Sequence, residues 1–134
     1  TARLLDILSG HQGPISGVQF NPAHPYLVTC SWDKTLKVWD IYNRKVAVES
    51  LLHTSDVVCI AVRPDGDQVC TGDLTGNLYF WDPQDGSLSF TIDGSKDIRG
   101  GRRQTDQRSA LNSTHSLCFT SLCYSADGTT ILAG

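Results

Sequence analysis

Three side chains early in the chain carry the groups of a nucleophile–histidine–acid triad. His11 is followed by Thr29 and Asp33, so an imidazole, a hydroxyl and a carboxylate could together activate an attacking oxygen. The same types return further on, because His53 is followed by Thr71. Catalytic sets are not expected to repeat along a chain. The repetition therefore favours a structural role, in which buried polar groups bond to one another.

The cysteines and histidines offer no other obvious chemistry. The five cysteines are scattered without CxxC spacing: Cys30, Cys59, Cys70, Cys118 and Cys123. An odd, unpaired set argues against a secreted disulfide framework and favours a reducing compartment. On expected strands these thiols would act as small apolar residues. No GxxxxGK[ST] phosphate-binding loop occurs, and we expect neither a metal nor a cofactor.

One segment is basic on an otherwise acidic chain. It carries five of the 11 basic residues and a net charge of +3, against −6 for the remainder: Lys96, Arg99, Arg102, Arg103 and Arg108. These side chains could bind RNA phosphates, bind an acidic protein partner, or only keep a loop solvated. No aromatic residue lies between Phe90 and Phe119, which argues against recognition of bases by stacking.

A repeat in the sequence defines the elements that must position these residues. Seven residues recur 42 positions later, each identical or apolar for apolar: His11, Phe20, Pro22, Thr29, Leu36, Trp39 and Asp40 recur as His53, Val62, Pro64, Thr71, Leu78, Trp81 and Asp82. A period near 42, with Gly-His early and Trp-Asp late, is typical of the four-stranded blade of a β-propeller. The sequence therefore predicts an all-β, partial β-propeller of about two and a half antiparallel blades.

A third copy begins after an insertion. His53 and Ile60 correspond to His115 and Leu122 at an offset of 62, which leaves 20 extra residues between the second and third copies. The predicted organisation is the last strand of a preceding blade (1–9), repeat one (10–51), repeat two (52–93), a basic inserted loop (94–113) and the start of repeat three (114–134). Because two and a half blades cannot close a ring, we expect the isolated chain to self-associate.

Short alternating or β-rich runs between turn residues predict the strands. The expected strands are 4–8; 15–20, 26–31, 36–40 and 45–50; 57–62, 68–72, 77–82 and 87–92; and 119–124 and 130–133. Neither a long helix nor a membrane-spanning segment is expected, since the apolar runs are only a few residues long.

The Gly10-His11 start and the Trp39-Asp40 end resemble those of the WD-repeat β-propeller superfamily. The resemblance implies a buried His–Thr–Asp–Trp network in each blade. In the first repeat it would comprise His11, Thr29, Asp33 and Trp39. The second repeat has His53, Thr71 and Trp81 but Thr75 in place of the acid, so we expect a weaker network; the third has His115, with Ala133 at the Thr position.

Two narrower features, the turn containing Trp32 and Lys34 and the basic insertion, resemble a nucleolar WD-repeat family. That resemblance implies two tandem propellers and a non-catalytic scaffold in the small-subunit processome, within its UTP-B subcomplex. The scaffold would hold proteins and a small nucleolar ribonucleoprotein during pre-ribosomal RNA processing. The alternatives are an adaptor of another nuclear complex and a direct binder of the RNA backbone. Trp32 and Lys34 could contact a partner, since Trp is enriched in interface hot spots, or Trp32 could cover a neighbouring blade.

Overall fold

Two four-stranded antiparallel sheets and a two-stranded hairpin form the structure, a computed structural model that describes residues 3–4, 6–42, 47–94 and 118–134. The first sheet contains β1 (Ile15–Phe20), β2 (Tyr26–Ser31), β3 (Thr35–Asp40) and β4 (Ala47–Leu52) in sequence order. The second contains β5 (Val57–Val62), β6 (Val69–Asp73), β7 (Asn77–Trp81) and β8 (Leu88–Asp93). The hairpin pairs β9 (Leu122–Tyr124) with β10 (Ile131–Ala133). The all-β partial propeller is thus confirmed.

The two sheets are equivalent in register as well as in strand order. The ladder of β1 with β2 is irregular between Ile15 and Gly17, and that of β5 with β6 is irregular between Val57 and Cys59. The outer ladders shift at Val38/Trp39 and at Phe80/Trp81. Each pair of irregularities is 42 residues apart, so the sequence repeat is a repeat of backbone geometry.

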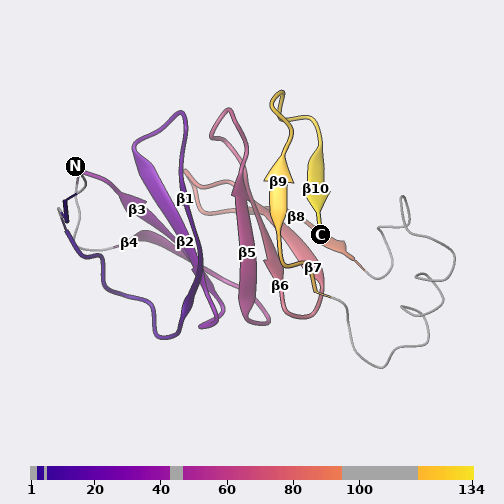
Figure 1. Cartoon of the computed structure of the whole chain (residues 1–134), viewed down its shortest axis with the longest axis horizontal. Helices are drawn as coiled ribbons and strands as arrows, with labels where there is room; N and C mark the ends of the chain where they lie inside the picture. Colours follow the sequence, from indigo (N-terminus) through magenta and orange to yellow (C-terminus); the bar gives the residue numbers. More distant parts are fainter. Residues whose placement is uncertain (1–2, 5, 43–46, 95–117) are drawn as a thin grey trace, which may run out of the picture.

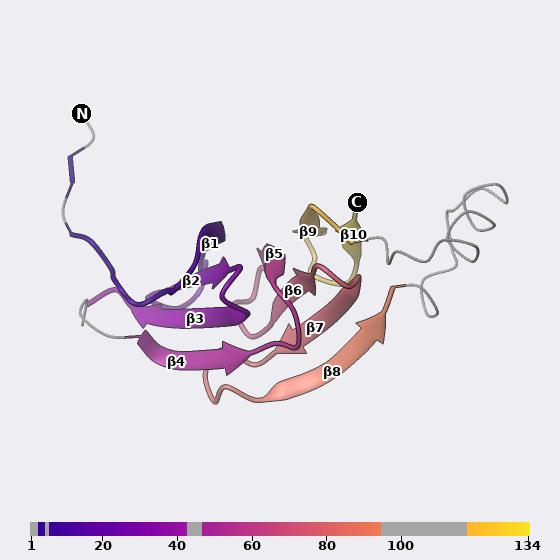
Figure 2. The ribbon, with the colours of Figure 1, turned by 90° about the horizontal axis from the view of Figure 1, so that it is seen from below.

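The sheets pack face to face like sectors of a ring. The innermost strands β1, β5 and β9 lie along one side, and β4 and β8 lie along the other (Figure 2). The first interface buries apolar side chains from both sheets, among them Val28, Cys30, Val57 and Ile60. Beyond the second sheet, β9 is packed against a smaller cluster that contains Phe119. Burial of these alternating side chains supplies the driving force for the blade stack.

The connections divide between two rims. The β1–β2, β5–β6 and β9–β10 turns lie on the rim at the top of Figure 1. On this rim, the buried Asn21 side-chain amide donates to the Gly66 carbonyl at 2.8 Å and so ties the two blades together. The β2–β3 and β6–β7 turns lie on the opposite rim, together with the connection from β4 to β5.

Most strands lie within two residues of their predicted limits, but the prediction of a strand over residues 4–8 is wrong. Among the described residues of this range there is no strand. A strand needs a neighbour to satisfy its backbone N–H and C=O groups, and the described residues offer none there. Leu4, Asp6 and Leu8 instead line a groove on the open face of the first sheet.

The third unit also begins its strand later than predicted, at Leu122 rather than Phe119. The amides of Thr120 and Ser121 both bond to the Gly134 carbonyl, at 2.7 and 3.0 Å, outside the regular ladder. Phe119 is buried in the cluster beside β6 and β7, and its carbonyl accepts from the Cys59 thiol at 3.2 Å. Packing of the Phe119 ring thus takes the place of strand pairing at this position.

Both ends of the blade stack expose apolar side chains. Val18 and Phe20 are exposed on β1, Leu88 and Phe90 on β8, and Leu132 on β10. Because open sheet faces and edges favour association, we expect the isolated chain to form dimers or larger species. Light scattering at increasing concentration should show a mean mass that rises above that of one chain. A single monomeric mass throughout would contradict this prediction.

No helix long and apolar enough to cross a bilayer occurs in the described part of the chain.

Candidate functional site

A buried polar network joins the strands of the first blade. The Nε2 atom of His11 lies 2.6 Å from the Thr29 hydroxyl, and Nδ1 lies 2.9 Å from an Asp33 carboxylate oxygen. The indole N–H of Trp39 donates to the same Thr29 hydroxyl at 2.9 Å. The structure therefore brings together four residues from the segment before β1, from β2 and β3, and from the turn between them. These partners place the ring proton of His11 on Nδ1, which donates to the Asp33 carboxylate. Nε2 then accepts from the Thr29 hydroxyl.

Asp33 holds the turn as well as the histidine. Its carboxylate accepts bonds from the Gln12 amide at 2.9 Å and from the Thr35 amide and hydroxyl at 2.9 and 2.5 Å. Partial burial acts to raise the pKa of this carboxyl. Hydrogen bonds from Thr35, the Gln12 amide and His11 outweigh that effect and hold the pKa well below its usual range. The group stays ionised wherever the protein is folded near neutral pH.

The geometry of the network resembles a catalytic triad, but the arrangement serves the fold. Thr29 is buried, and its oxygen already receives the Trp39 N–H and donates toward His11. A nucleophile must have a free lone pair facing a substrate. The Thr29 hydroxyl has neither an accessible surface nor an uncommitted donor, so the network fixes the register of the strands instead.

The second blade repeats most of these contacts. Nε2 of His53 lies 2.7 Å from the fully buried Thr71 hydroxyl, and the Trp81 indole donates to Thr71 at 3.1 Å. The difference lies on the other side of the ring, because Nδ1 of His53 is buried without a hydrogen-bond partner. Thr75 stands where the first blade has its acid, and its hydroxyl bonds to Asp73 at 2.7 Å instead of to the histidine.

An acid that sequence reasoning missed organises this turn. Asp73, fully buried at the end of β6, accepts from the amides of Thr75 and Asn77 at 3.1 and 2.9 Å and from the Tyr79 hydroxyl at 3.0 Å. It aligns with Ser31 of the first blade, two residues before the expected acid. In this blade the turn keeps a carboxylate, and what the network lacks is an acid bonded to the histidine Nδ1. The sequence signal was present, since Asp73 begins the run Asp73-Leu74-Thr75-Gly76 between two strands.

The buried histidine predicts a pH dependence of stability. Burial lowers the pKa of His53 to about 4, against the opposing effects of the Leu51 and Lys34 carbonyls and the Asp73 charge. An unfolded histidine has a pKa near 6.5, so only the unfolded state gains a proton as the pH falls from about 6.5 to about 4. Stability is thus full above this window and falls by roughly 3 kcal/mol through it.

Urea unfolding at a series of pH values checks this prediction. The carboxylates also titrate in acid, so the comparison is with a His53→Gln variant. In this variant the free energy of unfolding should change less with pH, because the contribution of the histidine is absent. Parallel curves for the two proteins between pH 6.5 and 4 would contradict it.

Three of the described thiols, those of Cys30, Cys59 and Cys70, are buried structural groups. Burial raises the pKa of Cys30 to about 11 and that of Cys59 to about 12. Burial also raises the pKa of Cys70, which is fully buried. Thiolates are the nucleophilic and metal-binding form, so these groups are unreactive near neutral pH. Within the described part of the chain, no cluster of three or more His, Cys, Asp or Glu residues could hold a metal ion.

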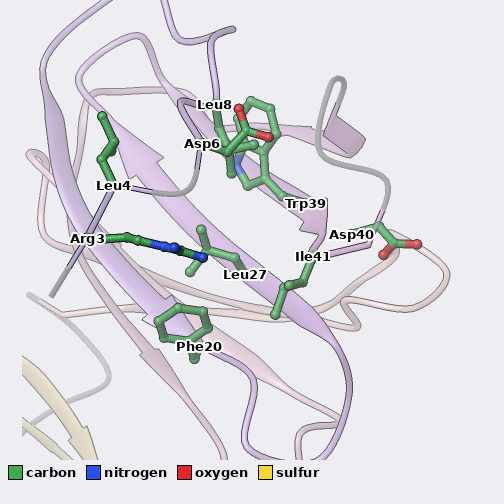
Figure 3. Close-up of a pocket in the computed structure, with 9 residues that line it drawn as sticks. All are labelled: Arg3, Leu4, Asp6, Leu8, Phe20, Leu27, Trp39, Asp40 and Ile41. Atoms are coloured by element: carbon green, nitrogen blue, oxygen red, sulfur yellow. The ribbon is translucent and has the colours of Figure 1, made fainter. Parts of the chain in front are cut away.

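A groove that the sequence did not predict lies on the open face of the first sheet. It has a volume of about 310 Å³ and lies between the segment before β1 and strands β1–β3 (Figure 3). Its sheet side carries Phe20, Leu27 and Trp39, with Asp40 at the end of β3. The charged Arg3 and Asp6 come from the segment before β1. Trp39 thus contributes its ring to this groove and its N–H to the buried network.

The two residues predicted to contact a partner lie on the rim at the bottom of Figure 1. Trp32 and Lys34 are exposed in the β2–β3 turn. Lys34 has a φ of 69°, the left-handed region, where the second blade has Gly76 with a φ of 89°. Its carbonyl accepts from the His53 amide at 2.8 Å, which fixes the turn against the next connection. The counterpart of Trp32 in the second blade is Leu74, also exposed, which sequence reasoning missed.

Several predicted site residues lie outside the described residues. They are His115 and the basic side chains of the insertion: Lys96, Arg99, Arg102, Arg103 and Arg108. The residues that flank residues 95–117 are described. The Gly94 amide bonds to the Gly76 carbonyl at 3.0 Å, and a Cβ at Gly94 would lie 2.6 Å from the Phe119 ring. The chain therefore leaves and re-enters the described part at one place, beside the turn that carries Leu74.

The repeat geometry and the duplicated network agree with comparison to known protein families. The family described as WD domain, G-beta repeat, matches residues 2–40 and 47–82. The chain belongs to this WD40 repeat family.

More specific similarity runs along the whole chain. It is 49% identical over 133 residues to Periodic tryptophan protein 2 of Arabidopsis thaliana, which covers 99% of the chain and 15% of that relative. It is 48% identical over 133 residues to the Periodic tryptophan protein 2 homolog of Schizosaccharomyces pombe, covering 99% of the chain and 16% of the relative. The Saccharomyces cerevisiae protein of the same name is 41% identical over 134 residues, 100% of the chain and 14% of the relative. The chain thus spans about 15% of the length of these relatives.

Proposed function

We propose that this chain is a non-catalytic scaffold module that holds proteins of a large ribonucleoprotein assembly. The observation that carries the proposal is the division of roles between its residues. The His–Thr pairs that resemble a catalytic triad are buried in networks that fix the blades, whereas the β2–β3 and β6–β7 turns expose Trp32, Lys34 and Leu74. Such a rigid support with an exposed rim suits binding rather than turnover.

We further propose that the assembly is the nucleolar small-subunit processome, acting in pre-ribosomal RNA processing. The support is the resemblance of the turn and the insertion to a nucleolar WD-repeat family, together with the similarity to proteins named Periodic tryptophan protein 2. In this proposal the partner-binding residues are Trp32, Lys34 and the basic side chains of the insertion.

The test is affinity recovery of the full-length protein from nuclear extract, with a fluorescent fusion to report its location. The proposal expects other propeller proteins and a small nucleolar RNA to be recovered with it, and a nucleolar signal. Recovery of a ubiquitin ligase or of chromatin components in their place would favour an adaptor of another nuclear complex.

The positive charge of the insertion supports a second candidate, direct binding to the RNA backbone. Its five basic and two acidic side chains give +3 on a chain that is otherwise acidic. Binding through phosphates weakens steeply with salt, because each contact releases counterions. Steep salt dependence that is lost when the five basic residues are changed to Ala would favour this candidate over a protein scaffold.

A further inference from the structure

Three polar side chains from two blades meet beside the rim at the top of Figure 1. His24 lies in the β1–β2 turn of the first blade, and Asp67 lies in the β5–β6 turn of the second. Gln84, in the β7–β8 turn, joins them. The Nε2 atom of His24 is 3.2 Å from an Asp67 carboxylate oxygen and 3.0 Å from the side-chain nitrogen of Gln84. That nitrogen is 3.4 Å from the same oxygen. These three residues are called the inter-blade cluster below.

Hydrogen bonds alone do not satisfy every contact of the inter-blade cluster. If Nε2 of His24 carries a proton and donates to Asp67, it also meets the N–H groups of Gln84 at 3.0 Å. If Nε2 instead accepts from Gln84, its lone pair lies 3.2 Å from the carboxylate oxygen. Turning the Gln84 amide exchanges its nitrogen for its oxygen, and then two oxygens lie 3.4 Å apart. Each arrangement of protons therefore leaves one pair of like groups in contact.

The spacing of the three atoms suits the coordination of one metal ion. Bonds of about 2.1 Å that meet at roughly 90–110° hold donor atoms about 3.0–3.4 Å apart. The separations in the inter-blade cluster are 3.0, 3.2 and 3.4 Å. With the Gln84 amide turned, an imidazole nitrogen and two oxygens would share a single cation, whose charge removes the repulsion between them.

The chemistry of the donors selects the kind of ion. Magnesium and calcium prefer sites made of oxygen alone, whereas an imidazole nitrogen favours zinc and its neighbours among the transition metals. The His24 and Asp67 side chains are 35% and 56% exposed, so water can complete the coordination from the open side.

The turn that carries the histidine is fixed before any ion binds. The buried Asn21 side chain accepts from the His24 amide at 3.0 Å and donates to the Gly66 carbonyl at 2.8 Å. One side chain thus holds the β1–β2 turn against the residue that precedes Asp67. Such support of the ligands reduces the cost of ordering them around a metal.

We propose that His24, Asp67 and Gln84 bind a zinc ion that links the two blades at this rim. One donor is an amide, so the site is compatible with the lack of any larger His, Cys, Asp or Glu cluster in the described part of the chain. The sequence did not predict it, because His24 and Gln84 are 60 positions apart. The inference goes beyond the proposed scaffold function and does not depend on it.

The test is a calorimetric titration of zinc chloride into the metal-free full-length protein, with His24→Gln as the comparison. We expect one zinc ion to bind with a dissociation constant of about 10 µM, and the His24→Gln variant to bind it at least ten-fold more weakly. Hydrogen exchange read by mass spectrometry locates the site. Zinc should slow exchange of the Ala23 and His24 amides, which bond to Asn21, in the original protein only.

Two further variants separate coordination from folding and from general attraction to an acidic surface. Gln84→Glu replaces the amide by a carboxylate, so zinc should bind about ten-fold more tightly, although the added charge would repel Asp67 in the absence of metal. Asp127→Asn removes a charge from the exposed β9–β10 turn on the same rim and should leave zinc binding within about two-fold. Thermal melts in chelator establish that each variant is folded.

Three outcomes would overturn the inference. The first is no zinc-dependent slowing of exchange at Ala23 and His24. The second is zinc binding that is equal in the original protein and in His24→Gln. The third is a Gln84→Glu variant that is folded but binds zinc no more tightly, which would leave the inter-blade cluster as a hydrogen-bonded contact only.

Discussion

Replacing Asp33 by Ala should lower the free energy of unfolding by about 3 kcal/mol and the melting temperature by roughly 10 °C. The carboxylate accepts bonds from His11, the Gln12 amide, and the amide and hydroxyl of Thr35. Its removal leaves the His11 N–H with only a longer contact, 3.2 Å to the Thr35 hydroxyl, and a poorly satisfied buried donor costs more than the lost bond itself. Differential scanning calorimetry measures the change.

Two variants control this prediction. Asp33→Asn keeps one acceptor oxygen and the shape of the side chain, so the free energy of unfolding should fall less than in Asp33→Ala. Asp127 makes a similar turn, bonding to Ser125 and Thr129, but it is fully exposed. Water can replace those bonds, so Asp127→Ala should change stability much less. Equal losses for Asp33→Ala and Asp127→Ala would show that the first-blade network does not stabilise the fold. Binding of protein partners should be largely kept in Asp33→Ala wherever the variant is folded.

Replacing Gly94 by Val should destabilise the second blade by about 3 kcal/mol. A Cβ at this position would lie 2.4 Å from the Gly76 carbonyl oxygen and 2.6 Å from the Phe119 ring. Neither the carbonyl nor the ring can move away easily, because the carbonyl accepts a hydrogen bond from the Gly94 amide and Phe119 is buried. The substitution therefore breaks the link between the β6–β7 turn and the end of β8 and displaces the ring that covers it.

Urea unfolding, together with hydrogen exchange of the Gly94 amide, would check this result. Gly134→Val is the matched control, because nothing lies within 4 Å of a Cβ built there. We expect the control to unfold at the same urea concentration as the original chain. Unchanged protection and stability in Gly94→Val would mean that the two ends of the insertion are not held together as the structure describes.

The blade architecture could be predicted from the sequence because its period is a property of the chain. His11 and His53 recur at the same distance before Trp39 and Trp81, and each histidine is bonded to the corresponding threonine. Alternating apolar residues and turn residues locate the strands, since side chains on a strand face opposite sides in turn. Such signals lie within a few residues of one another and need no tertiary information.

Other features depended on which atoms meet in space. In the second blade Asp73 stabilises the turn, although it lies two residues before the position of the expected acid. Its carboxylate reaches the amides of Thr75 and Asn77 and the Tyr79 hydroxyl. The run Asp73-Leu74-Thr75-Gly76 marks a turn in the sequence, but the groups that the carboxylate bonds depend on the backbone path around it.

The sequence by itself thus determined the fold class, the repeat, most strands and the residues of the buried networks. Only the tertiary structure decided that the described residues among 4–8 form no strand, that His53 has an unpartnered nitrogen, and that Trp32 and Leu74 are exposed on one rim. The physical reason is that periodicity records which face of an element is buried. Pairing, satisfaction of polar groups and exposure depend on neighbours that are distant along the chain.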